Sequence, residues 1–171
     1  MNTVKILKTS ISETSVKDVS NILITKNSLK VAICNTNTVV RSYQDDQLNK
    51  IINSFDIKTP DGFPVAKSSS ILYKNNQSRV DGYNVLLKTI NDGLNSNTSH
   101  YFYGSDDFVL KKLIVKLKDE FPTINIVGSF SPPVGTHEEL IKEGSVKNII
   151  DIKPDIVWVS LGFPKQELFI N

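Results

Sequence analysis

Two short segments of the chain carry residue types that could do chemistry. The first, residues 59–64, reads Thr-Pro-Asp-Gly-Phe-Pro and places one carboxylate, Asp61, between a proline and a glycine. Pro-Asp-Gly is also favourable turn chemistry, because proline presets one backbone angle and glycine accepts a positive φ. On the residues alone, a turn is the simpler interpretation of this segment.

The second segment, residues 161–167, reads Leu-Gly-Phe-Pro-Lys-Gln-Glu and follows an apolar run. Gly162 allows a ligand to approach the backbone closely, and Pro164 suits the first turn of a helix. Lys165 and Gln166 would add a cation and amide donors beside that helix N-terminus. The segment therefore predicts an anion or sugar site, with a plain strand-to-helix turn as the alternative.

Several common chemistries have no support in the sequence. Neither G-x-G-x-x-G nor G-x-x-x-x-G-K-[ST] occurs, which removes most support for a dehydrogenase or an ATPase. Cys34, His100 and His137 lack metal-ligand spacing, and no G-x-S-x-G elbow supports a serine hydrolase. The adjacent acidic pairs at 45–46 and 106–107 would diverge on a helix surface, so we expect capping or solvated residues there and no metal site.

Alternating strand and helix patterns would position the two segments. Strand-like runs occupy residues 30–34, 100–103, 123–127 and 156–160, and helical patterns occupy residues 15–24, 39–52, 107–117 and 135–150. This β-α-β order predicts an α/β fold, with a Rossmann-like, mostly parallel sheet and helices on both faces. Residues 59–84 are expected to be irregular, and the apolar run at 156–160 is typical of a strand buried on both faces.

In such a sheet, ligands bind at the carboxyl ends of the strands, where helix N-termini point at them. Three predicted loops fall at that edge, over residues 35–38, 104–107 and 161–167. The first helix, starting near Ser15, shows a capping box because Asp18 follows three residues on.

Length and composition are those of an ordinary globular protein. A chain of 171 residues normally forms one domain, and 39% hydrophobic with 22% charged residues excludes disorder. The net charge of +2 is too weak for a typical nucleic-acid binder, so we expect no nucleic-acid partner. Cys34 is the single cysteine, and no apolar run approaches the ~18 residues of a spanning helix. We therefore expect a cytoplasmic protein with peripheral membrane contact.

Taken together, the two segments resemble the WecG/TagA/CpsF glycosyltransferase family. Most of the resemblance lies in two motifs, Pro-Asp-Gly and, far along the chain, Leu-Gly-x-Pro-Lys-Gln-Glu. Further matches are Arg-Val-Asp-Gly-Tyr at 79–83, Phe-Tyr-Gly at 102–104, Asn-Ile-Val-Gly at 125–128 and Pro-Asp at 154–155. The resemblance runs from Ile6 to Phe169, nearly the whole chain.

The resemblance implies an inverting glycosyltransferase that moves N-acetylmannosamine or a related hexose from a UDP-sugar. The implied acceptor is a polyprenyl-diphosphate-linked sugar, in cell-surface polysaccharide or teichoic acid synthesis. Asp61 is the implied catalytic base, which takes the proton of the attacking acceptor hydroxyl. The other implied substrate-binding residues are Thr36, Asn37, Gly62, Arg79, Gly82, Gly104, Gly162, Lys165, Gln166 and Glu167. Because the chain has no Asp-x-Asp, we expect transfer without a metal or other cofactor.

The chain departs from the family pattern at three points, and these departures limit the functional inferences that the resemblance supports. Asn84 stands where the family usually has aspartate, and Phe169 where it usually has tryptophan. Family members also continue beyond the last motif with a tail that is associated with membrane docking and supplies arginines to the active site, whereas this chain stops at Asn171. We therefore expect one glycosyltransferase domain over residues 1–171, which is either truncated at its C-terminus or a natural short form.

The expected loss of the tail predicts further properties and keeps two other functions open. The short apolar end at residues 168–170 predicts that the chain forms a homo-oligomer or is poorly active alone. The expected location is the cytoplasm, at the inner face of the plasma membrane. The alternative function is a non-catalytic sugar-nucleotide-binding or accessory subunit that supports a partner transferase. A structural α/β domain without a small ligand would require both motifs to be coincidence.

Overall fold

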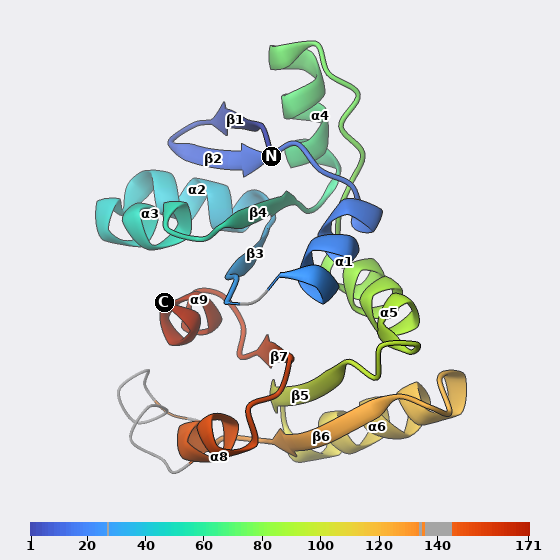
Figure 1. The fold of residues 1–171 in the computed structure, drawn as a ribbon. Helices are drawn as coiled ribbons and strands as arrows, with labels where there is room; N and C mark the ends of the chain where they lie inside the picture. The colour runs from blue at the N-terminus through green and yellow to red at the C-terminus, as the bar shows by residue number, and fades with distance from the viewer. Residues whose placement is uncertain (27, 134, 136–144) are drawn as a thin grey trace. The chain divides into compact units, whose positions relative to one another are not determined.

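The computed structural model describes residues 1–26, 28–133, 135 and 145–171 (Figure 1). The chain divides into two compact units: an N-terminal unit of residues 1–89 with Asn171, and a C-terminal unit of residues 90–170. Each unit combines parallel strands with helices, which confirms the predicted α/β class. None of the helices in these described ranges is both long and apolar enough to cross a bilayer.

The N-terminal unit contains two pairs of strands. The strands β1 (Thr3–Ile6) and β2 (Thr9–Ser12) form an antiparallel hairpin, whereas β3 (Val31–Cys34) and β4 (Ile57–Pro60) pair in parallel. The helices are α1 (Val16–Thr25), α2 (Thr36–Gln44), α3 (Asp46–Asn53), α4 (Phe63–Tyr73) and α5 (Gly82–Gly93), whose last residues belong to the C-terminal unit. Because α2 and α3 connect β3 to β4, this part of the chain is the expected β-α-β unit.

Short polar side chains begin three of these helices. Ser15 and Asp18 form the predicted capping box of α1. Asn35 and Asp45 accept hydrogen bonds from backbone N–H groups in the first turns of α2 and α3, respectively. Asp45 has extended backbone angles, so the helix predicted over residues 39–52 is instead two helices that meet at this cap.

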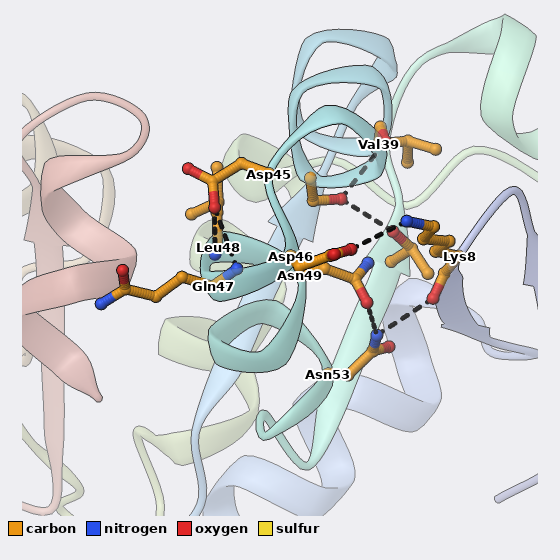
Figure 2. A network of polar contacts seen from close by, with 10 residues as sticks. Lys8, Val39, Asp45, Asp46, Gln47, Leu48, Asn49 and Asn53 are labelled. Carbon is orange, nitrogen blue, oxygen red and sulfur yellow. Dashed lines mark hydrogen bonds and ion pairs between the residues drawn. The ribbon is translucent and has the colours of Figure 1, made fainter.

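Polar contacts fasten the β1–β2 hairpin to α2 and α3 (Figure 2). Lys8 forms an ion pair with Asp46 at 2.8 Å, and its carbonyl accepts a hydrogen bond from Asn53 Nδ2 at 3.0 Å. The hydroxyl groups of Thr9 and Ser42 lie 2.9 Å apart. This hairpin is not among the elements predicted from the sequence, because each strand has only four residues and only β1 alternates between polar and apolar residues.

The prediction that residues 59–84 are irregular is wrong. They contain the end of β4, the whole of α4 and the start of α5. A run of three serines at 68–70 conceals α4, since serine hydroxyls compete for backbone hydrogen bonds and weaken helix propensity. The helix forms because Val65, Ala66 and Ser69 are buried, and tertiary packing overrides weak local preference.

The C-terminal unit contains a three-stranded parallel sheet. Its strands are β5 (Ser99–Gly104), β6 (Asn125–Phe130) and β7 (Ile156–Ser160), in the order β6-β5-β7. The described helices are α6 (Asp107–Glu120), α8 (Ser145–Ile152) and α9 (Lys165–Ile170). Asp106 caps α6, as expected for this acidic pair. The helix predicted from residue 135 is seen from Ser145 onward, and residues 136–144 lie outside the described part of the chain.

The central strand of this sheet is the buried one. Residues 100–104 of β5 are all buried, whereas Ile156 is the one buried residue of β7. The prediction that residues 156–160 are buried on both faces is therefore wrong. The reason is position, because β7 lies at the edge of the sheet and β5 lies between its two neighbours.

His100 lies in this buried strand and is 1% exposed. The indole Nε1 of Trp158 donates to His100 Nδ1 at 3.2 Å, and the two rings stack with centroids 6.2 Å apart. A neutral imidazole that accepts at Nδ1 carries its proton on Nε2. Burial lowers the pKa of His100 from 6.5 to about 4, and the nearby charge of Asp155 opposes this shift in part.

We predict that His100 makes the fold sensitive to mild acid. Above pH 6.5 the side chain is neutral in the folded and unfolded states alike. Between 6.5 and about 4 only the unfolded chain takes up the proton, so stability falls as the pH falls. Each pH unit lowers the free energy of unfolding by up to ~1.4 kcal/mol. Urea unfolding of the wild type and His100→Gln at about pH 7.5 and about pH 5 measures this loss. Equal acid losses in the two proteins would contradict the prediction.

Candidate active site

Asp61 stands at the carboxyl end of β4, in the connection to α4. Its backbone N–H donates to the carbonyl of Cys34, the last residue of β3, at 3.0 Å. Gly62 follows with a φ of +81°, which favours glycine, and directly precedes α4. The Pro-Asp-Gly segment is thus a strand-to-helix connection that fixes the backbone of Asp61 close to the start of α2.

Arg79 binds the carboxylate of Asp61. Its Nε lies 3.0 Å from Asp61 Oδ1 and 3.9 Å from Asp81 Oδ2, so the guanidinium bridges two carboxylates. The N–H of Val80 donates to the carbonyl of Pro60 at 3.0 Å, which holds this segment against the end of β4. The hydrogen bond and charge of Asp61 raise the pKa of Arg79, which keeps the guanidinium cationic.

The Asp61–Arg79 pair can be reached from solvent. The side chain of Asp61 is 19% exposed and that of Arg79 is 58% exposed. Arg79 contacts Oδ1 of Asp61, and Oδ2 has no hydrogen-bond partner within the described ranges. One carboxylate oxygen is therefore oriented by the cation while the other can still accept a proton.

Asp81 is the residue of this cluster that sequence reasoning missed. Its Oδ1 accepts from the backbone N–H of Asn84 at 3.0 Å, and its Oδ2 accepts from the Asn84 amide at 2.7 Å. Burial pushes the pKa of Asp81 up, but the bonds from Asn84 and the charge of Arg79 outweigh it, so the pKa is lowered. The family that the chain resembles usually has aspartate at position 84. An ionised aspartate could not donate the side-chain hydrogen bond that Asn84 gives to Asp81. One feature of the sequence could have indicated the role of Asp81, namely that it follows Arg79 by only two residues.

Thr36 and Asn37 lie in the first turn of α2, so the prediction of a loop over residues 35–38 is wrong. Both side chains are exposed, whereas the Asn35 side chain is engaged as the helix cap. The first backbone N–H groups of a helix lack intrahelical acceptors and can bind an anion. Gly82 begins α5 without a steric need for glycine, because a Cβ there would meet Ile33 Cγ1 at an ordinary 3.5 Å.

In the C-terminal unit, Gly104 ends β5 in close contact with the end of β7. Gly104 has a φ of +84°, and a Cβ there would lie 2.5 Å from the carbonyl oxygen of Ser160. The N–H of Ser105 donates to the same oxygen at 3.0 Å. Gly162 also has a positive φ of +77°, but a Cβ there would meet none of the described atoms within 4 Å. Sterics therefore demand glycine more strongly at position 104 than at 162.

The three polar residues that begin α9 differ in exposure. Lys165 is exposed, and its ammonium donates to the carbonyl of Gly135 at 3.0 Å. The amide of Gln166 donates to Glu167 Oε1 at 2.9 Å. Glu167 is 1% exposed, and its Oε2 has no hydrogen-bond partner in the part of the chain that the structure describes. Burial raises the pKa of Glu167, so its carboxyl lies inside the unit and is drawn toward the neutral form.

The predicted site residues thus form one group on each unit. In the N-terminal unit, Asp61, Gly62 and Arg79 gather at the end of β4, and Thr36 and Asn37 follow the neighbouring strand β3. In the C-terminal unit, the residues follow β5 and β7, two paired strands. Among the described residues, no three His, Cys, Asp or Glu side chains gather into a set that could hold a metal ion. The roles of the two groups in substrate binding stay predictions.

The order of these segments matches a known family over almost the entire chain. The Glycosyl transferase WecG/TagA/CpsF family matches residues 4–171. The chain belongs to this family. The match spans both the Asp61 segment and the Lys165–Glu167 segment, so the two groups of residues share one family origin.

Curated relatives within the family carry one enzyme name, N-acetylglucosaminyldiphosphoundecaprenol N-acetyl-beta-D-mannosaminyltransferase. The relative from Bacillus spizizenii is 30% identical over 128 residues, which cover 75% of this chain and 48% of the relative. The relative from Bacillus subtilis is 28% identical over 141 residues, covering 82% and 53%. The relative from Staphylococcus aureus strain NCTC 8325 is 26% identical over 144 residues, covering 84% and 55%. The chain spans about half the length of these relatives.

We predict unequal costs for alanine at the two positive-φ glycines of the C-terminal unit. Gly162→Ala adds the strain of a positive φ alone, about 1–2 kcal/mol. Gly104→Ala adds the same strain and a contact of 2.5 Å with the Ser160 carbonyl, for a further ~1–3 kcal/mol. Urea unfolding of the two variants compares these costs directly. Equal destabilisation would show that the end of β7 moves freely away from β5.

Proposed function

We propose that this chain carries the catalytic domain of an inverting glycosyltransferase. The donor is a UDP-sugar of N-acetylmannosamine or a related hexose, and the acceptor is a sugar on a polyprenyl diphosphate. Membership of the family and the enzyme name that its relatives share support this proposal. The reaction belongs to cell-surface polysaccharide or teichoic acid synthesis, at the inner face of the plasma membrane.

The single observation that carries the proposal is the geometry of Asp61. Arg79 engages Oδ1 while Oδ2 has no partner among the described residues, so Oδ2 is the proposed proton acceptor. The acceptor hydroxyl attacks the anomeric carbon as Asp61 takes its proton, and the bond from that carbon to the UDP oxygen breaks. The new glycosidic bond forms on the opposite face, which inverts the anomeric configuration.

The departing diphosphate needs positive charge or hydrogen-bond donors, because charge develops on its leaving oxygen. The first turn of α2, with exposed Thr36 and Asn37, supplies backbone N–H donors in the N-terminal unit. Lys165, on the C-terminal unit, is a separate candidate for a substrate-binding cation. We propose that transfer is metal-independent.

Catalysis explains the Asp61 cluster better than a binding-only accessory role. A nucleotide-binding subunit has no need for a carboxylate with a free oxygen beside an arginine. The names of the relatives also describe transferases. Homo-oligomer formation stays a prediction.

We predict that Asp61→Asn strongly lowers the rate of transfer while leaving the fold intact. The change is nearly isosteric but removes the base, which should lower kcat by about 10²–10⁴-fold. Asp46→Asn is the matched control, since Asp46 lies in the same unit and pairs with Lys8 at the surface. Initial transfer rates are measured with a chelator and with magnesium, together with melting curves. Undiminished transfer by Asp61→Asn would remove this residue from the mechanism, and a requirement for magnesium would refute metal-free transfer.

A further inference from the structure

Arg79 lies in the connection between α4 and α5, residues 74–81, which contains neither helix nor strand. Its side chain is 58% exposed, so few neighbouring atoms hold the guanidinium in place by packing. The direction of Arg79 therefore depends on where the backbone of this connection is anchored. One anchor follows Arg79, because the N–H of Val80 donates to the carbonyl of Pro60 at 3.0 Å. A single hydrogen bond fixes one point, so a second anchor before Arg79 is needed to fix its direction.

Gln77 supplies the second anchor through its side-chain amide. Its Oε1 accepts from the backbone N–H of Thr14 at 3.1 Å, and its Nε2 donates to the Thr14 carbonyl at 2.6 Å. The same Nε2 donates to the carbonyl of Ser78 at 2.7 Å. The backbone N–H of Gln77 also donates to Ser70 Oγ, on α4, at 3.2 Å. The amide thus binds both backbone groups of Thr14, as a residue of a neighbouring strand would, and we call this contact the Gln77–Thr14 clasp.

The partners of Gln77 require an amide at this position. A backbone N–H can only donate and a carbonyl can only accept, so the clasp needs an acceptor and a donor on one side chain. An ionised carboxylate could accept from the Thr14 N–H but would lie against two carbonyl oxygens. An apolar side chain could form none of these bonds. Glutamine is therefore matched to its partners here, although the side chain lies in a connection without regular structure.

Thr14 is attached to the strand that leads to the candidate base. It is buried, and it directly follows the end of β2. There the hydroxyl of Ser12 accepts from the backbone N–H of Lys58, on β4, at 3.1 Å. Since Asp61 continues β4, the clasp fixes Arg79 relative to the same strand that carries Asp61.

We propose that Gln77 is a positioning residue, which acts by holding the connection so that the Arg79 guanidinium stays on Asp61. The consequence for the reaction rests on the proposed function, in which Asp61 takes the proton of the acceptor hydroxyl. The position of Arg79 does not depend on that function and can be measured without substrates.

The Nε–H signal of Arg79 in heteronuclear NMR spectra reports this position directly. The chain has two arginines, so Arg41→Lys assigns the signal of Arg79. Gln77→Met keeps the length of the side chain but removes the amide. It should move the Arg79 signal toward its position in Asp61→Asn, in which the carboxylate is absent. Asn76→Ala, at the exposed neighbouring position, is the control and should leave the signal unchanged.

An Arg79 signal in folded Gln77→Met that equals that of the wild type would overturn the proposal. Gln77→Asn is the milder second variant, because it keeps an amide that is one methylene shorter and cannot reach both backbone groups of Thr14. It should move the Arg79 signal in the same direction, and an unchanged signal would count equally against the clasp. Melting curves establish that each variant is folded.

Transfer rates test the consequence for the reaction. Gln77→Met should lower kcat by about tenfold or more, because small displacements of catalytic groups are costly. In the Arg79→Gln background the same change should lower kcat by less than about twofold, since the clasp acts through Arg79. Losses that multiply in the double variant would show that Gln77 acts by another route and would overturn its positioning role. No transfer by the wild type, together with a shifted Arg79 signal in Gln77→Met, would refute the proposed function while supporting the clasp.

Discussion

Two backbone hydrogen bonds at the carboxyl end of β4 determine the geometry on which the proposed chemistry depends. The N–H of Asp61 binds the carbonyl of Cys34, and the N–H of Val80 binds the carbonyl of Pro60. The first bond extends the β3–β4 pairing by one residue, and the second brings Arg79 back to the same strand end. The 3.0 Å contact between Arg79 and Asp61 follows from these backbone positions, and the strand β4 beneath is buried.

Some of the strained backbone and unpaired buried polar groups lie in or beside the family motifs, and others, such as those of Asn49 and Thr89, lie elsewhere in the described part of the chain. Gly104 accepts a contact that any other residue would turn into a clash. Glu167 leaves Oε2 buried without a partner in the described part of the chain, and the hydroxyl of Thr59, two residues before Asp61, does the same. Each buried polar group without a hydrogen-bond partner lowers the free energy of unfolding by about 1–3 kcal/mol. Native proteins often carry such costs at functional sites, and Gly104 and Glu167 both stand in family motifs.

Features set by local chemistry could be predicted from the sequence, and features set by neighbours could not. The capping box at Ser15 and Asp18, the cap at Asp106 and the strand at 156–160 follow from residue types and spacing alone. Helix α4 could not be predicted, because its serines hide a helix that packing against the hairpin stabilises. The edge position of β7 depends on strand order, which a run of apolar residues does not encode. In the candidate site, Asp61 and Arg79 were found through family motifs. The bridging role of Asp81 required the fold, because only the fold brings its carboxylate to Arg79.

The proposed mechanism requires that Arg79 orients Asp61 for proton transfer, and a double-mutant cycle on the transfer rate tests this requirement most directly. Transfer is measured at saturating donor and acceptor for the wild type, Arg79→Gln, Asp61→Asn and the double variant. If Arg79 acts through Asp61, Arg79→Gln should lower kcat by about ten- to a hundredfold in the wild type and by less than about twofold in the Asp61→Asn background. Losses that multiply in the double variant would show that the two residues act independently, and the proposed role of Arg79 would be wrong.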